Sequence, residues 1–275
     1  MSEPVPVTPA PSATILLLRE TPAFEVLMVL RHQQIDFASG ALVFPGGKTH
    51  AGDHDQAWEA RCLGWALHDA DARPLRIAAI REAYEETGIL LARHADGSAF
   101  AGDERAGAAR DEIAHDRRSF LSLVDELDVK LDLDALSVFA RWITPTMMPK
   151  RFDTWFFVAA APADQLAVCD GWETVDAEWI APAEALRLGE AKERTIIFPT
   201  RMNLQLLAEA SGADDAIARA RARTLVTVEP KVVNGPQGRM LVIPPDAGYG
   251  AVTESMERAV AGAGGPRPAG GPAGN

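Results

Sequence analysis

Cysteine is scarce in this 275-residue sequence, which contains only Cys62 and Cys169. Two cysteines cannot form the disulfide framework of a small secreted protein, so a reducing compartment is expected. Long hydrophobic runs are also missing. The first apolar run, residues 15–18, is far too short for a signal peptide or a membrane span, and no basic segment precedes it. We therefore predict a cytoplasmic protein with no membrane partner.

Positive charge is the second shortage, because 27 lysines and arginines stand against 39 aspartates and glutamates, giving a net charge of −12. Binding of nucleic acid through a basic surface is therefore not expected. An acidic protein that acts on a phosphorylated small molecule needs local cations, which a bound metal would supply. The sequence has no G-x-S-x-G, Walker or C-x-x-C motif, and its six histidines show no metal-ligand spacing.

Carboxylates are abundant, and one group of them has a telling spacing. Glu82, Glu85 and Glu86 stand at i, i+3 and i+4, so on a helix they share one face. Oxygen ligands at this density favour Mg²⁺ or Mn²⁺. The alternative is the solvated face of an amphipathic helix. The upstream stretch at 43–48, Val-Phe-Pro-Gly-Gly-Lys, favours the metal site, because backbone can approach a ligand closely at a Gly-Gly turn.

Residues 81–89, Arg-Glu-Ala-Tyr-Glu-Glu-Thr-Gly-Ile, resemble the second half of the Nudix hydrolase signature. That signature reads Gly, five residues, Glu, seven residues, then Arg-Glu-apolar-x-Glu-Glu-x-Gly-apolar. Its first half is matched by Gly47 and, in the place of the glutamate, Asp53. Here 27 residues separate Asp53 from Arg81, so the signature is split by an insertion of about twenty residues.

The resemblance implies an α/β fold, namely an α/β/α sandwich around a mixed sheet. It also implies a metal held by Glu82, Glu85 and Glu86, with Arg81 orienting one of these carboxylates. Gly46 and Gly47 would fix the path of the loop beside the helix. A water activated at this site would hydrolyse a diphosphate bond between a nucleoside moiety and another group.

Two further stretches are similar to the coenzyme A and acyl-coenzyme A diphosphatases of this family. They are Leu30-Arg31 with the following Gly40 and Phe-Pro-Gly-Gly, and the segment 142–157, which reads W-I-T-P and then P-K-R-F-D-T-W-F-F. Insertions inside the signature also occur in that subgroup. Coenzyme A or acyl-coenzyme A is therefore the expected substrate. ADP-ribose, NADH or another dinucleotide is the alternative substrate, and a non-catalytic binding or regulatory module is the alternative function.

Cationic residues outside the helix are candidates for contacting substrate phosphate: Arg31, Lys48, Lys150 and Arg151. For Arg31 the alternative is an ordinary arginine at a strand end, and for Lys150 and Arg151 a charged hairpin loop. A further carboxylate often completes the site in the family, and Glu173 is favoured over Glu178 for this role. The resemblance is also compatible with a homodimer.

The rest of the pattern predicts a flexible arm at 1–12, one domain at 13–250 and a disordered tail at 257–275. A hairpin is expected at 13–18 and 24–30, and the functional helix at 74–87, where Gly88 can end it. Helical insertions are expected at about 54–73 and 95–128. Further strands are predicted at 136–143 and 152–160, helices at 183–188, 196–210 and 214–223, and a hairpin at 226–232 and 239–243.

Overall fold

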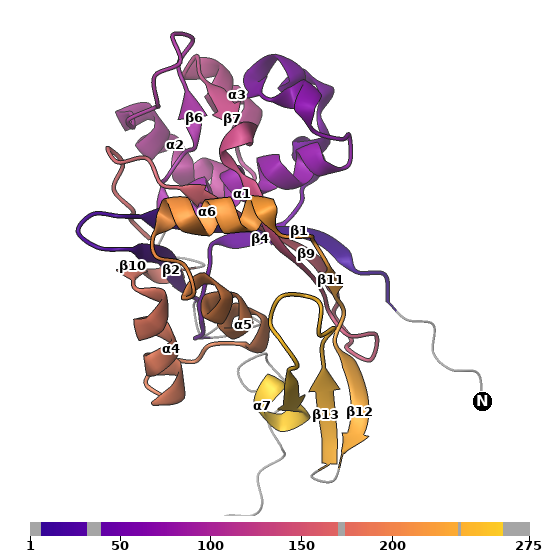
Figure 1. Ribbon diagram of the computed structural model, residues 1–275. Helices are drawn as coiled ribbons and strands as arrows, with labels where there is room; N and C mark the ends of the chain where they lie inside the picture. Colours follow the sequence, from indigo (N-terminus) through magenta and orange to yellow (C-terminus); the bar gives the residue numbers. More distant parts are fainter. Residues whose placement is uncertain (1–6, 32–39, 170–173, 236–237, 261–275) are drawn as a thin grey trace, which may run out of the picture.

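A mixed β-sheet forms the centre of the computed structural model, which describes residues 7–31, 40–169, 174–235 and 238–260 (Figure 1). Its strand order is β10-β2-β1-β9-β8-β11, with β3 paired to β2 and β4 to β1. The β1/β9 and β8/β11 pairs are parallel and the others antiparallel. The strands are β1 (Ala10–Arg19), β2 (Glu25–Arg31), β3 (Leu42–Val43), β4 (Gly46–Lys48), β8 (Ser137–Ile143), β9 (Phe152–Ala160), β10 (Thr174–Ile180) and β11 (Thr227–Val228).

Both faces of this sheet are covered, because side chains alternate along β1. Ala13, Ile15 and Leu17 belong to one buried cluster, and Leu16 and Leu18 to another. The first cluster includes α1 (Ala72–Thr87), α2 (Glu104–Ala114) and α3 (Phe120–Glu126). The second includes α4 (Pro182–Glu190), α5 (Phe198–Leu207) and α6 (Ala213–Ala222). The predicted α/β fold, a mixed sheet between helical layers, is confirmed.

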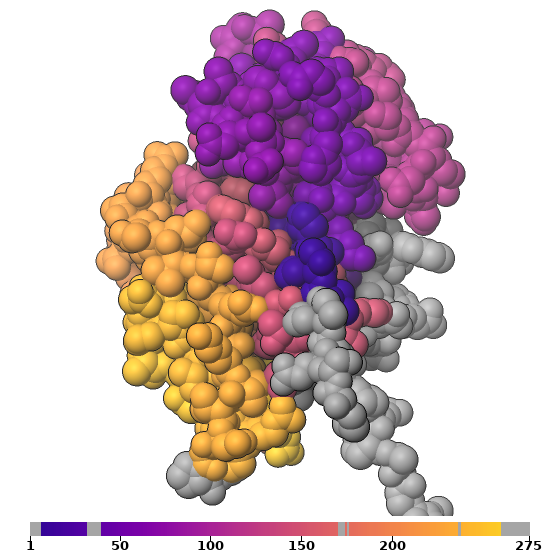
Figure 2. Space-filling view, turned by 90° about the vertical axis from the view of Figure 1, so that its right-hand side faces the viewer, coloured from indigo at the N-terminus to yellow at the C-terminus, as the bar shows by residue number. Residues whose placement is uncertain are grey.

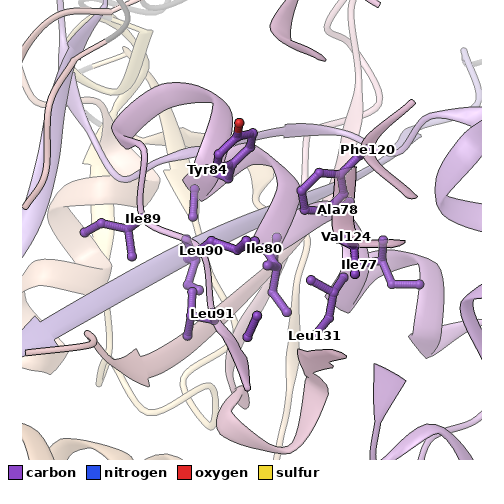
Figure 3. Packing of buried hydrophobic residues seen from close by; sticks show 14 of the residues in the cluster. Ile77, Ala78, Ile80, Tyr84, Ile89, Leu90, Leu91, Phe120, Val124 and Leu131 are labelled. Atoms are coloured by element: carbon purple, nitrogen blue, oxygen red, sulfur yellow. The ribbon is translucent and has the colours of Figure 1, made fainter. Parts of the chain in front are cut away.

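Helix α1 is buried on all sides rather than along one stripe. Every residue from Pro74 to Thr87 is buried. Ile77 and Ile80 lie in the cluster that also contains Phe120 and Leu131, and the Tyr84 ring stacks on Phe120 at 5.7 Å (Figure 3). Because the helix has no solvated face, its polar residues need partners within the protein.

A small unit follows α6 and packs against the second cluster. It contains β12 (Lys231–Gly235), β13 (Gly238–Val242), β14 (Thr253–Ser255) and α7 (Met256–Val260). A buried polar chain anchors it: Trp142 Nε1 donates to the Tyr249 hydroxyl at 3.1 Å, which donates to Asn203 Oδ1 at 2.6 Å. The predicted terminal hairpin is confirmed as β12–β13, whereas residues 227–228 join the main sheet.

The prediction of a helix at 54–73 is wrong. This segment forms three 3₁₀ turns, η1 (Ala51–His54), η2 (Gln56–Arg61) and η3 (Trp65–Leu67), with β5 (Cys62–Leu63) among them. β5 pairs with β7 (Lys130–Asp132), which also pairs with β6 (Ala92–Arg93). The spacing of apolar residues did not indicate a helix correctly, because one of them, Leu67, is exposed. In addition, Gly64 at φ 74° would interrupt a helix. Trp58 is the large side chain that this segment buries.

Other boundaries also differ from the predictions. β1 begins at Ala10, inside the predicted arm, because Ala10–Ser12 pair with β9. The second insertion does contain helices, and α2 begins at Glu104 because the Asp103 carboxylate accepts a hydrogen bond from the Arg105 N–H. The first residues of the predicted tail belong to α7, and residues 261–275 lie outside the described part. Within the described residues, no helix is long and apolar enough to cross a membrane.

Candidate active site

The three glutamates of α1 lie in one buried turn. Glu82, Glu85 and Glu86 are only 7%, 9% and 3% exposed, so the alternative of a solvated helix face is wrong. The helix ends as predicted: Gly88 adopts φ 78° and its N–H donates to the Tyr84 carbonyl at 2.8 Å. Buried carboxylates need compensation, and the structure shows how each is held.

Arg81 is the centre of the hydrogen-bond network at this turn. Its Nη1 contacts both Glu82 Oε1 and Glu85 Oε2 at 2.9 Å. On the other side, Nε and Nη2 donate to the two oxygens of Asp53 at 3.0 and 3.1 Å, and Nη2 also reaches the Lys48 carbonyl at 2.8 Å. Asp53, although one methylene shorter than glutamate, therefore joins the first half of the signature to Arg81 in the second half. The insertion follows Asp53 in the sequence.

The Gly-Gly turn packs directly against these carboxylates. The Gly46 N–H donates to Glu86 Oε2 at 3.0 Å. A Cβ atom added at Gly47 would lie 2.5 Å from Glu82 Oε1, and one at Gly46 would lie 2.5 Å from the Ala13 carbonyl oxygen. Glycine at position 47 lets β4 approach the α1 carboxylates this closely, and glycine at position 46 lets it approach β1.

Alanine at Gly47 is expected to lower kcat by at least tenfold while changing the melting temperature by only a few degrees. The added methyl group must displace the Glu82 carboxylate, which is the mobile end of a side chain, and small misplacements of reacting groups are costly. Steady-state kinetics and thermal unfolding measure the two effects. The matched control is Gly52→Ala, because nothing lies within 4 Å of a Cβ there. Unchanged kcat in Gly47→Ala would show that the position of Glu82 is unimportant.

The electrostatics of the turn are dominated by burial and by charge crowding. Burial raises the pKa of Glu85 to about 8; Arg81 opposes this shift and the Glu82 carboxylate reinforces it. Burial alone would lower the pKa of Arg81, but the carboxylates of Glu82, Asp53 and Glu85 outweigh burial and raise it. One guanidinium is thus shared by three carboxylates, with Glu86 in the same turn.

A cavity of about 740 Å³ opens over this turn and includes Glu82, Glu85, Glu86, Gly46 and Gly47 in its lining. This volume is typical of small-molecule sites. Two of the predicted cationic residues, Arg31 and Lys48, also line the cavity. Arg31 Nε is buried and has no hydrogen-bond partner among the described residues, so it can donate to a bound anion.

Arg151 and Glu178, two of the candidate residues, form ion pairs outside the glutamate turn. Arg151 is buried away from the cavity, where it pairs with Glu229 at 2.7 Å and donates to the Thr144 and Val7 carbonyls. Neither it nor Lys150 lines the cavity. Glu178 faces Arg194 at 3.6 Å. The favoured Glu173 lies outside the described residues; the Thr174 hydroxyl donates to the Glu86 carbonyl at 3.3 Å.

Several polar residues of the cavity were not predicted from the sequence, among them His50, Arg110 and His115. His50 follows β4, and its imidazole lies 3.5 Å from the Asp116 carboxylate. Arg110 and His115 come from α2 and the residue after it. Arg110 Nε donates to the Glu85 carbonyl at 2.8 Å, which joins the insertion to the end of α1. No spacing signal marks these residues. The folding of the second insertion brings Arg110 and His115 to the cavity, and the path of the chain after β4 brings His50 there.

The carboxylates of this turn are the candidate ligands for a metal ion. Among the described residues, no three His, Cys, Asp or Glu side chains are arranged so as to hold a metal ion. Arg81 Nη1 instead lies between Glu82 and Glu85. The chemistry still fits a hard divalent cation, because the candidate ligands are three carboxylates on one buried turn.

The chain is similar to known proteins over much of its length. The family model described as the NUDT19 Nudix domain matches residues 61–206. The acyl-coenzyme A diphosphatase NUDT19 of Homo sapiens is 28% identical, covering 82% of this chain and 72% of its own. The protein of the same name from Gallus gallus is 27% identical, covering 82% and 73%.

The fold also has a solved counterpart. The crystal structure of a NUDIX hydrolase from Alicyclobacillus acidocaldarius superposes with a TM-score of 0.67 at 24% identity, covering 77% of this chain and 96% of that one. The family match spans more than half of the sequence and includes the whole of α1. The chain therefore belongs to the NUDT19 Nudix domain family, and it is a Nudix hydrolase.

Proposed function

We propose that this protein hydrolyses the diphosphate bond of coenzyme A or of an acyl-coenzyme A, yielding 3′,5′-ADP and a phosphopantetheine product. The observation that carries the proposal is the buried turn of Glu82, Glu85 and Glu86, held against the Gly46-Gly47 backbone at the wall of a large cavity. The printed names of the human and chicken relatives support the choice of substrate. The stretches around Arg31 and at 142–157 support it from the sequence.

Glu82, Glu85 and Glu86 would hold the divalent cation, which we propose to be Mg²⁺ or Mn²⁺. When bound, such an ion neutralises phosphate oxygens and lowers the pKa of a water molecule. Arg81 contributes by holding two of these carboxylates and tying them to Asp53, so it acts on their position rather than on substrate.

The remaining groups of the site contact the substrate itself. Arg31 and Lys48 place positive charge at the cavity wall, where they bind phosphate oxygens and stabilise the leaving phosphate. The oxygen of the attacking water forms a bond to phosphorus, and the bond from phosphorus to the bridging oxygen of the leaving phosphate breaks. Glu173 remains the residue predicted to accept the proton of the water. A cytoplasmic location and a homodimer also remain predictions from the sequence.

The test is a substrate panel assayed with Mg²⁺, with Mn²⁺ and with EDTA, in which products are identified by mass spectrometry. The proposal expects metal-dependent cleavage of coenzyme A and acyl-coenzyme A to 3′,5′-ADP, at least tenfold faster than cleavage of ADP-ribose or NADH. Faster cleavage of a dinucleotide would show that the dinucleotide, and not coenzyme A, is the substrate. Binding of coenzyme A without cleavage in either metal would favour a non-catalytic module.

A further inference from the structure

The cavity has two chemically different ends. One end carries the carboxylates of α1 with Arg31, Lys48 and His50. The other is lined mainly by apolar side chains, although Thr144, Thr154 and Thr200 also lie on the elements that form it. The apolar residues come from β8, β9, β13, α5, α7 and the turn after β8: Trp142, Pro145, Met147, Met148, Phe156, Phe198, Leu241, Met256 and Ala259. An apolar lining is usual in small-molecule sites, and here it can accept an apolar part of a substrate that also carries a diphosphate.

Three of these nine apolar residues come from the chain that follows the matched Nudix region. Leu241 lies on β13, and Met256 and Ala259 lie on α7, all beyond residue 206. In Figure 2 this C-terminal part, in orange and yellow, gathers on one side of the molecule below the purple part. The Trp142–Tyr249–Asn203 hydrogen bonds fix it against β8 and α5, so the wall is formed before any ligand binds.

We propose that this apolar end binds the acyl chain of an acyl-coenzyme A, so that the C-terminal unit selects substrates by chain length. This inference rests on the function proposed above. In an acyl-coenzyme A the pantetheine arm separates the diphosphate from the thioester, so a cavity polar at one end and apolar at the other matches the order of groups. The thioester itself does not react.

The chemistry of the wall favours a hydrocarbon chain over the adenine ring. Adenine presents several hydrogen-bonding atoms, but the Trp142 N–H is already committed to Tyr249. Three methionines line this end, and methionine side chains adapt to ligands of different shape. Each methylene buried there strengthens binding, so affinity should increase along a series of acyl chains.

The test compares coenzyme A with its acetyl, butyryl and octanoyl thioesters in wild type and in Met256→Glu. Wild type should show kcat/KM on the order of tenfold higher for octanoyl-coenzyme A than for coenzyme A. In Met256→Glu this increase should disappear, because a charge now lies at the apolar end, so that kcat/KM for octanoyl-coenzyme A and for coenzyme A should agree within about twofold. Met148→Glu, in the turn after β8, is a second variant in case the first is unstable.

The matched control is Val233→Glu, which adds the same charge on β12 at an exposed residue that does not line the cavity. It should keep the full chain-length dependence. Calorimetric binding in EDTA gives a readout independent of turnover: octanoyl-coenzyme A should bind more tightly than coenzyme A to wild type and to Val233→Glu, but not to Met256→Glu. Equal binding of all chain lengths by wild type would overturn the inference, as would equal losses for coenzyme A and its thioesters in Met256→Glu. Absence of coenzyme A cleavage, with chain-length-dependent binding retained, would overturn the proposed function alone.

Discussion

Glutamine in place of Glu86 is expected to reduce the turnover of coenzyme A by about a hundred- to a thousandfold. The substitution removes a negative charge from the buried turn but preserves the shape of the side chain. Its amide oxygen can still accept the Gly46 N–H that now reaches Glu86 Oε2 at 3.0 Å, so the turn should keep its structure. The loss should therefore appear in kcat rather than in folding.

Single-turnover and steady-state kinetics at saturating metal would measure this loss, with thermal unfolding as the check on folding. The matched control is Glu184→Gln, since Glu184 is exposed on α4, where it pairs with Arg187. That variant should retain full activity. If Glu86→Gln turned over at more than about a tenth of the wild-type rate, the glutamate turn could not be the catalytic centre.

The essential features of the site could be predicted because they are local in the sequence. The i, i+3, i+4 spacing of the glutamates fixes which helix face they share, and Gly88 fixes where the helix ends. The approach of the Gly-Gly turn follows from the same logic, because only glycine at position 47 leaves room for the Glu82 carboxylate.

The features that could not be predicted depend on contacts between distant parts of the chain. Arg31 and Arg151 look alike in the sequence, since each is a cationic residue at one end of a strand. Pairing with Glu229, 78 positions away, makes Arg151 structural, whereas Arg31 lines the cavity. Likewise, α1 has no solvated face, because Trp58 from the first insertion and Phe120 from the second belong to the buried cluster around it.

Removal of the Arg81 guanidinium is expected to have the largest effect on stability. Methionine at this position keeps most of the side-chain volume but leaves Asp53, Glu82 and Glu85 buried without their shared cation. Breaking a buried ion pair in this way costs about 3–5 kcal/mol of the free energy of unfolding. Urea unfolding of Arg81→Met in EDTA would measure this loss without any contribution from bound metal.

The matched control is Arg61→Met, which removes an arginine that pairs with Asp125 and Asp128 where the carboxylates are exposed. Solvent screens such pairs, so this variant should lose less than about 1 kcal/mol. Asp53→Asn should destabilise less in the Arg81→Met background than in wild type, because the two residues act as one unit. Additive effects of Arg81→Met and Asp53→Asn would mean that Asp53 does not hold Arg81, and the residue that closes the split signature would have to be sought elsewhere.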